Sequence, residues 1–408
     1  MSSETCLIIG AGQAASHLAF SLRKEGWLGP ITMIGAESEA PYHKPVLSKE
    51  FLLSEKSIDD IMIRSSKAYK EKSIQVLNGA RVMHIDRVNK QVRLSNGQQQ
   101  RFDKLAICTG ATPRLLNIEG HDKKNIFYLN NFQDAHQLRS TITRQKPKTA
   151  CIIGGGFIGL ELACCLRKLD VQVKLIETEN RILSRVSAPE ISEYFTAVHQ
   201  QAGVEFLFNT KAIAFEGRDA VTSIRCDNGL SYNADLVIVG IGVTPNTQLA
   251  IDAKLNVNNG IVVNTNCVTS DSDIVSAGDC TIQYHPLSGG EIRMESIQNA
   301  MLQARKAAAS LCNKLTPTEE IPWFWSDQYQ TKLQIAGLSL NYTHTIKRGS
   351  KDKFSLWYFA NDQLKAVDCI NLPKDFLFAK RVLTKNILID QNRLKEQDMP
   401  LEAACLFD

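Results

Sequence analysis

An α/β fold with two separate parallel sheets, followed by an α+β region, is predicted for this chain of 408 residues by three observations. Two glycine-rich turns, at residues 10–15 and 154–159, each follow a short apolar strand and precede a helix. After each of these units comes a stretch that alternates between apolar and polar residues, as an antiparallel meander does. These stretches are residues 74–107, with Asn96-Gly97 as a hairpin turn, and residues 204–226. From residue 321 onward, apolar strands are followed by one amphipathic helix, which indicates a separate C-terminal domain.

The composition is that of an ordinary globular protein, with 44% hydrophobic and 22% charged residues. The formal net charge of +4 is too small to indicate nucleic-acid binding. No apolar run approaches the roughly 18 residues of a membrane span, and the first strand begins too early to leave room for a signal peptide. The 11 cysteines include no C-x-x-C pair, which favours reduced thiols. We therefore expect a cytoplasmic protein that binds no metal, membrane or nucleic acid.

The stronger glycine turn is GGGFIG at residues 154–159, between an apolar strand and a helix. Gly154 makes the tight turn, Gly156 lets the backbone approach a pyrophosphate, and Gly159 lets helix and strand pack closely. The N-terminus of the helix offers free N–H groups and partial positive charge to phosphates. After the next apolar strand, Glu177 stands where a carboxylate binds ribose hydroxyls. This unit predicts a dinucleotide site.

The first turn, GAGQAA at residues 10–15, gives the related pattern G-x-G-x-x-A. A helix is expected over residues 14–25, with Gly26 ending it. Position 36, where an acid is expected after the second strand, is alanine, and Glu37 is the first carboxylate. A plain βαβ unit without a ligand gives the same pattern. Two such units nevertheless suggest two dinucleotides, and FAD with NADH or NADPH is the simplest donor–acceptor pair.

Eight segments, in chain order, carry a resemblance to a known family: GAGQAA at 10, PYHKPVLSK at 41, TGATPR at 109, GGGFIGLELA at 154, GIGVTPN at 240, AGDC at 277, MESIQNAMLQARKAA at 294 and PWFWSDQY at 322. Over nearly its whole length the chain resembles the FAD-dependent ferredoxin reductases of bacterial oxygenase systems. The resemblance implies two Rossmann-like domains arranged as in glutathione reductase, and a C-terminal α+β domain. The implied domains are an FAD-binding domain of residues 1–112 and 236–320, an NAD-binding domain of 113–235 and a C-terminal domain of 321–408.

The function implied by the resemblance is electron transfer from NADH through FAD, one electron at a time, to a [2Fe–2S] ferredoxin that feeds an oxygenase. The segment Pro41–Lys49 contains no cysteine, whereas related disulfide reductases and peroxidases need one or two beside the flavin. Electrons are therefore expected to leave to an external carrier. Two alternatives stay open: a rubredoxin reductase, and an NADH-sensing flavoprotein resembling apoptosis-inducing factor.

The resemblance also implies two sets of cofactor-binding residues. The expected FAD set is Gly10, Gly12, Ala14, Ala15, Glu37, Lys44, Pro45, Lys49, Val82, Thr109, Gly110, Asp279, Ser296, Ile297 and Trp325. The expected NAD set is Gly154, Gly156, Phe157, Ile158, Gly159, Glu161, Glu177, Arg185 and Gly242. NADH is expected rather than NADPH, because the carboxylate of Glu177 repels a 2′-phosphate, although Arg181 and Arg185 are close enough in sequence to accept one. The family commonly has arginine at Lys44, and lysine keeps the charge but loses the bidentate fork.

Lys49 and Glu161 are the residues expected to act in catalysis. Glu161 lies in the apolar stretch FIGLELACCL, where a carboxylate is costly unless it is paired. The resemblance places Lys49 beside the flavin as its partner, across the domain boundary. We expect the pair to order hydride transfer and to balance charge on the reduced flavin. A purely structural ion pair between domains is the alternative.

Two helices complete the expected site. Ser296 is a predicted N-cap for a helix that reaches residue 311, and the resemblance aims its N-terminus, near Ile297, at the flavin. A second helix, expected over residues 374–385, carries Lys380, Arg381 and Lys385. Because small ferredoxins are acidic, this basic face is a candidate docking surface. A solvated charged face gives the same pattern.

Overall fold

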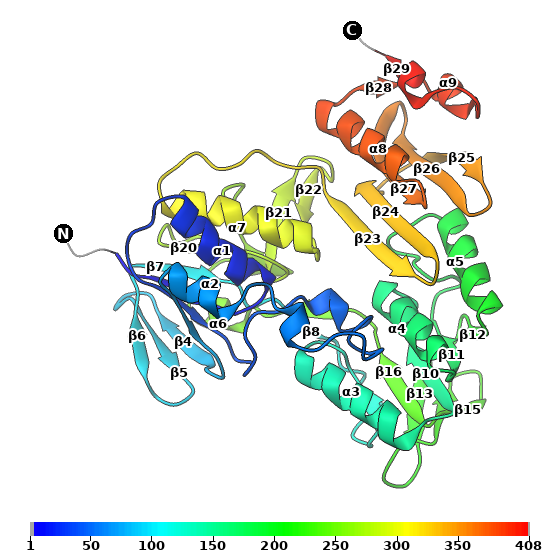
Figure 1. The fold of residues 1–408 in the computed structure, drawn as a ribbon, viewed down its shortest axis with the longest axis horizontal. Coiled ribbons are helices and arrows are strands. Elements are labelled where there is room, and N and C mark those ends of the chain that lie inside the picture. The colour runs from blue at the N-terminus through cyan, green and yellow to red at the C-terminus, as the bar shows by residue number, and fades with distance from the viewer. Residues whose placement is uncertain (1–3, 407–408) are drawn as a thin grey trace. The chain divides into compact units, whose positions relative to one another are not determined.

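The computed structural model describes residues 4–406, which form two compact units (Figure 1). The first unit comprises Met1–His43, Ile58–Thr112 and Thr244–Pro322. The second comprises Lys44–Ser57, Pro113–Val243 and Trp323–Asp408. None of the helices in residues 4–406 is long and apolar enough to cross a membrane.

A five-stranded parallel sheet forms the centre of the first unit, in the order β20-β7-β1-β2-β3. Its strands are β1 (Cys6–Ile9), β2 (Ile31–Ile34), β3 (Ile74–Leu77), β7 (Lys104–Ile107) and β20 (Ile274–Ser276). The helices α1 (Gln13–Lys24) and α7 (Ile297–Leu311) lie side by side and pack in one core with this sheet (Figure 1). The strands β1 and β2 are buried along their whole length and almost entirely apolar, because both faces of the sheet are covered.

The rest of the first unit consists of short elements. An antiparallel sheet contains β4 (Val82–Asp86), β5 (Gln91–Leu94) and β6 (Gln99–Arg101), with Gly97 in the predicted hairpin turn. The other elements are α2 (Ser66–Glu71), η2 (Asp59–Ile61), α6 (Gln248–Asp252), β18 (Val257–Asn258), β19 (Gly260–Val262), β21 (Thr281–His285) and β22 (Gly290–Ile292). The alternating pattern from residue 74 suggested one antiparallel meander, which is wrong for β3, because that strand extends the parallel sheet beside β2.

The second unit contains another five-stranded parallel sheet, in the order β12-β11-β10-β16-β9. Its strands are β9 (Ile126–Phe127), β10 (Thr149–Ile153), β11 (Gln172–Ile176), β12 (Val204–Leu207) and β16 (Leu236–Val239). Its helices are α3 (Phe132–Gln145), α4 (Phe157–Lys168) and α5 (Pro189–Gln201). A small antiparallel sheet contains β13 (Ala212–Glu216), β14 (Ser223–Cys226) and β15 (Ser231–Asn233). As with β3, the alternation at residue 204 marks an edge strand of the parallel sheet rather than part of the meander.

The boundary after this sheet differs from the expected one. Because β16 pairs with β10, residues 236–239 belong to the second unit, and the chain passes to the first unit only after Val243. Residues 44–57 also group with the second unit, although they follow the first glycine turn in sequence. The three-domain division stays a prediction, since the compact units number two.

The C-terminal region of the second unit is a five-stranded antiparallel sheet in the order β23-β24-β27-β26-β25. Its strands are β23 (Trp323–Gln328), β24 (Thr331–Gly337), β25 (His344–Ser350), β26 (Lys353–Ala360) and β27 (Gln363–Ile370). After them come α8 (Pro373–Lys385), β28 (Leu388–Ile389), α9 (Gln391–Lys395), η3 (Leu401–Ala404) and β29 (Cys405–Leu406). Leu333 and Leu356 of this sheet share one apolar core with Leu162 of α4 and Ile191 of α5. The C-terminal sheet therefore packs directly against the helices of the parallel sheet in the same unit.

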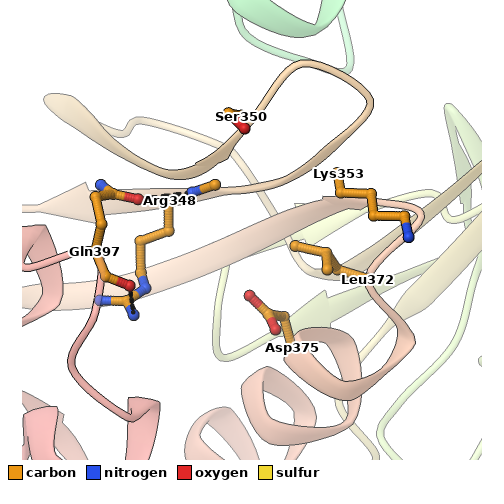
Figure 2. A pocket seen from close by; sticks show the side chains of 7 residues that line it. Arg348, Ser350, Lys353, Leu372, Asp375 and Gln397 are labelled. Carbon is orange, nitrogen blue, oxygen red and sulfur yellow. Dashed lines mark hydrogen bonds between the residues drawn. The ribbon is translucent and has the colours of Figure 1, made fainter.

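Arg348 of β25 ties the last part of the chain to this sheet (Figure 2). Its guanidinium donates hydrogen bonds to four backbone carbonyls, those of Leu394, Glu396, Gln397 and Met399, at 2.6–3.2 Å. A pocket of about 420 Å³ lies beside it. Because the arginine is already committed to these carbonyls, the pocket is not a natural anion site.

Candidate functional site

The first glycine turn is built as a phosphate cradle. Gly10 has φ +114°, and a Cβ there would lie 2.1 Å from the carbonyl oxygen of Cys108, so only glycine fits. Gly12 is the N-cap of α1, and no described side chain caps that helix, which leaves its first N–H groups for a ligand. Ala14 and Ala15 are buried beneath the turn. The residues expected from the sequence are therefore arranged as a pyrophosphate would require.

The N-terminal turns of α1 and α7 meet at Gly278. A Cβ on Gly278 would lie 3.1 Å from the Cβ of Ala14 and 4.0 Å from that of Ala300. Ser296 caps α7 by accepting from the backbone N–H of Asn299 at 3.1 Å, as the sequence predicted. Ile297 is the first residue of that helix, and Asp279 follows Gly278 directly.

Buried polar atoms without partners gather at the same two helix ends. Within the described chain they are Gln13 Oε1 on α1, Arg293 Nε in the segment before α7, and Gln298 Oε1 and Asn299 Oδ1 in the first turn of α7. Such atoms cost free energy unless something binds them. A polar ligand that spans both helix N-termini satisfies them, and this is the requirement that FAD meets.

The remaining expected FAD residues of the first unit lie in three places. Glu37 follows β2, and its Oε2 accepts a hydrogen bond from the hydroxyl of Tyr42 at 2.5 Å. Thr109 is fixed by Asn246, to whose carbonyl its Oγ1 donates at 2.7 Å, and Gly110 adopts φ +65°. Val82 is buried at the start of β4, within an apolar core.

The second glycine turn has the same construction. A Cβ on Gly154 would lie 2.4 Å from the oxygen of Gly240, and one on Gly159 would lie 2.2 Å from the oxygen of Gly154. Gly156 is the N-cap of α4, again without a capping side chain in residues 4–406. Around Gly156 a Cβ would meet nothing, so there is space for a ligand at this helix end. The geometry fits a second pyrophosphate.

Glu177 is held at the carboxyl end of β11 by the glycine turn itself. Its Oε2 accepts from the N–H of Gly155 at 2.7 Å, and its Oε1 accepts from the N–H of Glu179 at 3.0 Å. Arg181 donates to the Ser184 and Ser187 carbonyls and to Ser192 Oγ, so its guanidinium is already engaged.

Three further expected NAD residues surround this turn. Arg185 has an Nη2 atom 3.9 Å from the Cβ position of Gly242. Phe157 packs against Phe324, with ring centroids 4.7 Å apart. Ile158, on the first turn of α4, is 48% exposed, which is unusual for a large apolar residue and leaves it open to a ligand.

The predicted ion pair between Lys49 and Glu161 is present. Lys49 Nζ lies 3.0 Å from Glu161 Oε1, and the carboxyl also accepts from Ser326 Oγ at 2.7 Å and from Ser48 Oγ at 3.0 Å. Burial raises the pKa of the Glu161 carboxyl, and the charge of Lys49 and the two hydroxyls oppose that rise. The pair lies within the second unit, so the expectation that it joins two bodies is corrected: residues 44–57 pack with α4.

Sequence reasoning missed both serines. Ser48 lies one position before Lys49, in the segment that begins with the turn η1 (Lys44–Val46), which contains the expected residues Lys44 and Pro45. Ser326 lies in the aromatic stretch WFWSDQY, where only Trp325 was expected to take part in the site. Strand alternation was the available signal, since it places Ser326 on the face opposite Trp325.

The basic helix α8 is present and borders aromatic side chains. Lys380 Nζ lies 5.0 Å from the ring centroid of Trp323, which is next to the half-buried Trp325. Arg381 packs on Phe378 at 5.0 Å and has an Nη2 atom 3.8 Å from Glu402, which offsets part of its charge. Lys385 is exposed at the end of the helix.

Comparison with known proteins gives consistent matches along the whole chain. Residues 4–304 match the family model of pyridine nucleotide-disulphide oxidoreductases, and residues 323–405 match the reductase C-terminal domain. Putidaredoxin reductase CamA of Pseudomonas putida is 38% identical over 98% of this chain and 96% of its own length. Rhodocoxin reductase of Rhodococcus erythropolis is 36% identical over 98% and 93%. The crystal structure of the covalent putidaredoxin reductase–putidaredoxin complex matches with a TM-score of 0.95 at 38% identity, covering 99% of each chain.

Proposed function

The chain belongs to the pyridine nucleotide-disulphide oxidoreductases and, within them, to the FAD-dependent ferredoxin reductases of oxygenase systems, and we propose that it passes electrons from NADH singly to a [2Fe–2S] ferredoxin. The observation that carries the proposal is the pair of glycine-started helices, one in each unit, with uncapped N–H groups among the described residues. FAD, when bound, supplies the step that accepts two electrons together and releases them one at a time.

Each unit contributes a binding role in this proposal. In the first unit, Gly10, Gly12 and the N-termini of α1 and α7 bind the FAD pyrophosphate and its polar edge. In the second unit, Gly154 and Gly156 bind the NADH pyrophosphate, and Glu177 accepts from the ribose hydroxyls. Lys49, held by Glu161, is the cation that we propose orders hydride transfer and offsets the negative charge gained on reduction.

The cysteines support an external electron acceptor. All 11 are free, and 10 of them are buried. Burial raises the pKa of Cys165 to about 12, and the same effect raises the pKa of the other shifted thiols, whereas thiol–disulfide chemistry needs a thiolate. Free thiols in this number also fit a reducing compartment, so we propose a cytoplasmic location.

The proposed docking surface for the ferredoxin consists of Lys380, Arg381 and Lys385 on α8. Positive charge beside Trp323 and Trp325 would steer an acidic partner toward aromatic side chains. Replacing Arg381 and Lys385 with glutamate should raise the KM for ferredoxin at least several-fold at low salt and less at high salt. NADH–ferricyanide activity should stay unchanged, and an unchanged KM for ferredoxin would move the docking site elsewhere.

The central experiment measures flavin reduction and carrier dependence separately. Lys49→Met should slow flavin reduction by NADH in rapid mixing, whereas Lys67→Met, a change at a lysine 84% exposed on the surface, should not. In steady state, cytochrome c reduction by NADH should depend strongly on added [2Fe–2S] ferredoxin. Faster turnover with rubredoxin would favour a rubredoxin reductase. A sluggish reaction with every carrier would favour a sensor.

A further inference from the structure

A chain of hydrogen bonds continues from Glu161 on the side away from Lys49. Ser326 Oγ lies 2.7 Å from Glu161 Oε1, and Gln328 Nε2 lies 3.1 Å from Ser326 Oγ. Gln328 Oε1 lies 2.7 Å from His199 Nε2, and the hydroxyl of Tyr329 lies 3.4 Å from His199 Nδ1. All five residues belong to the second unit, and all but Tyr329 are buried.

The direction of every link in this chain is fixed by chemistry. The oxygen of Gln328 only accepts, so His199 carries its proton on Nε2, and its bare Nδ1 accepts from the Tyr329 hydroxyl. Burial lowers the pKa of His199 to about 4, so the imidazole is neutral at pH 7. The Glu161 carboxylate likewise only accepts, so Ser326 donates its single proton to it. Each donor therefore points toward Glu161.

Local structure explains why these side chains meet. Strand alternation in β23 places Ser326 and Gln328 on the buried face, opposite Trp325 and Asp327. β23 packs on α4, which carries Glu161. His199 comes from the last turn of α5 and is fully buried. Residues from three separate elements thus converge on one carboxylate.

We propose that Ser326, Gln328 and His199 are positioning residues that keep the Glu161 carboxylate ionised and directed at Lys49. Hydrogen bonds that run in one direction polarise one another, so each link strengthens the next. Only Lys49 and Ser48 would remain on Glu161 if Ser326 lost its hydroxyl. The consequence for catalysis rests on the proposed function, but the effect on the carboxyl group does not.

Other titratable groups near Glu161 do not substitute for this chain. Cys164 and Cys165 lie on the same helix, and burial raises the pKa of both thiols, so they stay neutral at pH 7. Lys168 lies farther along α4. Burial also raises the pKa of the Tyr329 hydroxyl, so it stays a donor. The basic side chain that contacts Glu161 from the neighbouring segment is Lys49.

The test is a carbon-13 NMR titration of glutamate carboxyl groups in the FAD-loaded protein, with the Glu161 signal identified by its loss in Glu161→Gln. Ser326→Ala should raise the pKa of Glu161 by about one to two units, since a hydrogen bond to a charged group is worth roughly 1.5–3 kcal/mol. Gln328→Met, which fills a similar volume without a donor, should raise it less, and Tyr329→Phe least. Gln334→Met makes the same change on β24, outside the chain, and should match the wild type.

A Glu161 pKa unchanged in both Ser326→Ala and Gln328→Met overturns the proposal, and if the first variant does not fold, the second decides alone. Rapid-mixing rates separate this result from the proposed function. If the Glu161 pKa rises but flavin reduction by NADH is unaffected, the positioning chain stands and the catalytic role of the ion pair falls. If Lys49→Met slows reduction while both Ser326→Ala and Gln328→Met leave the pKa of Glu161 unchanged, the catalytic role of the ion pair stands and the positioning chain falls.

Discussion

Asp368 makes the stability of this protein depend on pH. It lies on β27, fully buried, between Ile335 of β24 and Leu356 of β26. Its Oδ2 accepts from the Tyr358 hydroxyl at 2.6 Å, and that hydroxyl accepts from the N–H of Ala188 at the start of α5. Within the described chain, Oδ1 has no hydrogen-bond partner. Asp368→Asn removes the ionisable group and keeps an oxygen for Tyr358.

Burial raises the pKa of Asp368 from 3.8 to about 7, and the hydroxyls of Tyr358 and Ser187 oppose part of that rise. As pH rises, the unfolded chain therefore loses this proton at a lower pH than the folded protein does. Between pH 4 and pH 7 the folded state binds more protons than the unfolded state. Stability falls as pH rises through that window and levels off above about pH 7. The full window corresponds to about 4 kcal/mol, and the part between pH 5 and pH 7 to roughly 2 kcal/mol.

Urea unfolding between pH 5 and pH 8 measures this effect. Tryptophan fluorescence is a suitable probe, because Trp323, Trp325 and Trp357 of the chain's 4 tryptophans lie in the C-terminal sheet. The unfolding free energy of wild type minus that of Asp368→Asn should fall with rising pH. Asp362→Asn, at an exposed turn, should run parallel to wild type. A difference between wild type and Asp368→Asn that stays constant across this range would refute the reasoning.

Three further outcomes follow from single contacts. Gly159→Ala should destabilise the fold by about 1–3 kcal/mol, because its Cβ would lie 2.2 Å from a backbone oxygen. Gly156→Ala should keep the melting temperature of the wild type and only weaken NADH binding, as measured by calorimetry. Glu177→Arg should lower kcat/KM for NADH and raise it for NADPH; an unchanged ratio would show that another acid binds the ribose. Lys306→Met should lower the unfolding free energy by roughly 2–3 kcal/mol by leaving the carboxylate of Glu319 unpaired, and the added change Glu319→Leu should recover most of it.

The glycine turns were predictable because their constraint is local. Gly154 and Gly159 face backbone oxygens within a few residues or on the next strand, and no other residue type fits there. The edge strands β3 and β12 were misread because an edge strand of a parallel sheet, half exposed, alternates just as an antiparallel strand does. Which strand pairs with which depends on contacts far apart in sequence, and the position of β16 in the second sheet is such a case.

The two buried carboxylates Glu161 and Asp368 look alike in the sequence but have different surroundings in the fold. Glu161 and Asp368 both stand in apolar runs, LELAC and AVDCI, so the sequence signals an energetic cost in each. What differs is the set of partners brought by other elements: Glu161 receives a lysine and two hydroxyls, while Asp368 receives one tyrosine. The partners of the first carboxyl oppose the rise in its pKa that burial causes, whereas the second takes up its proton near neutral pH. A sequence pattern can locate a costly charge, but only the fold decides whether that charge is paired or neutralised.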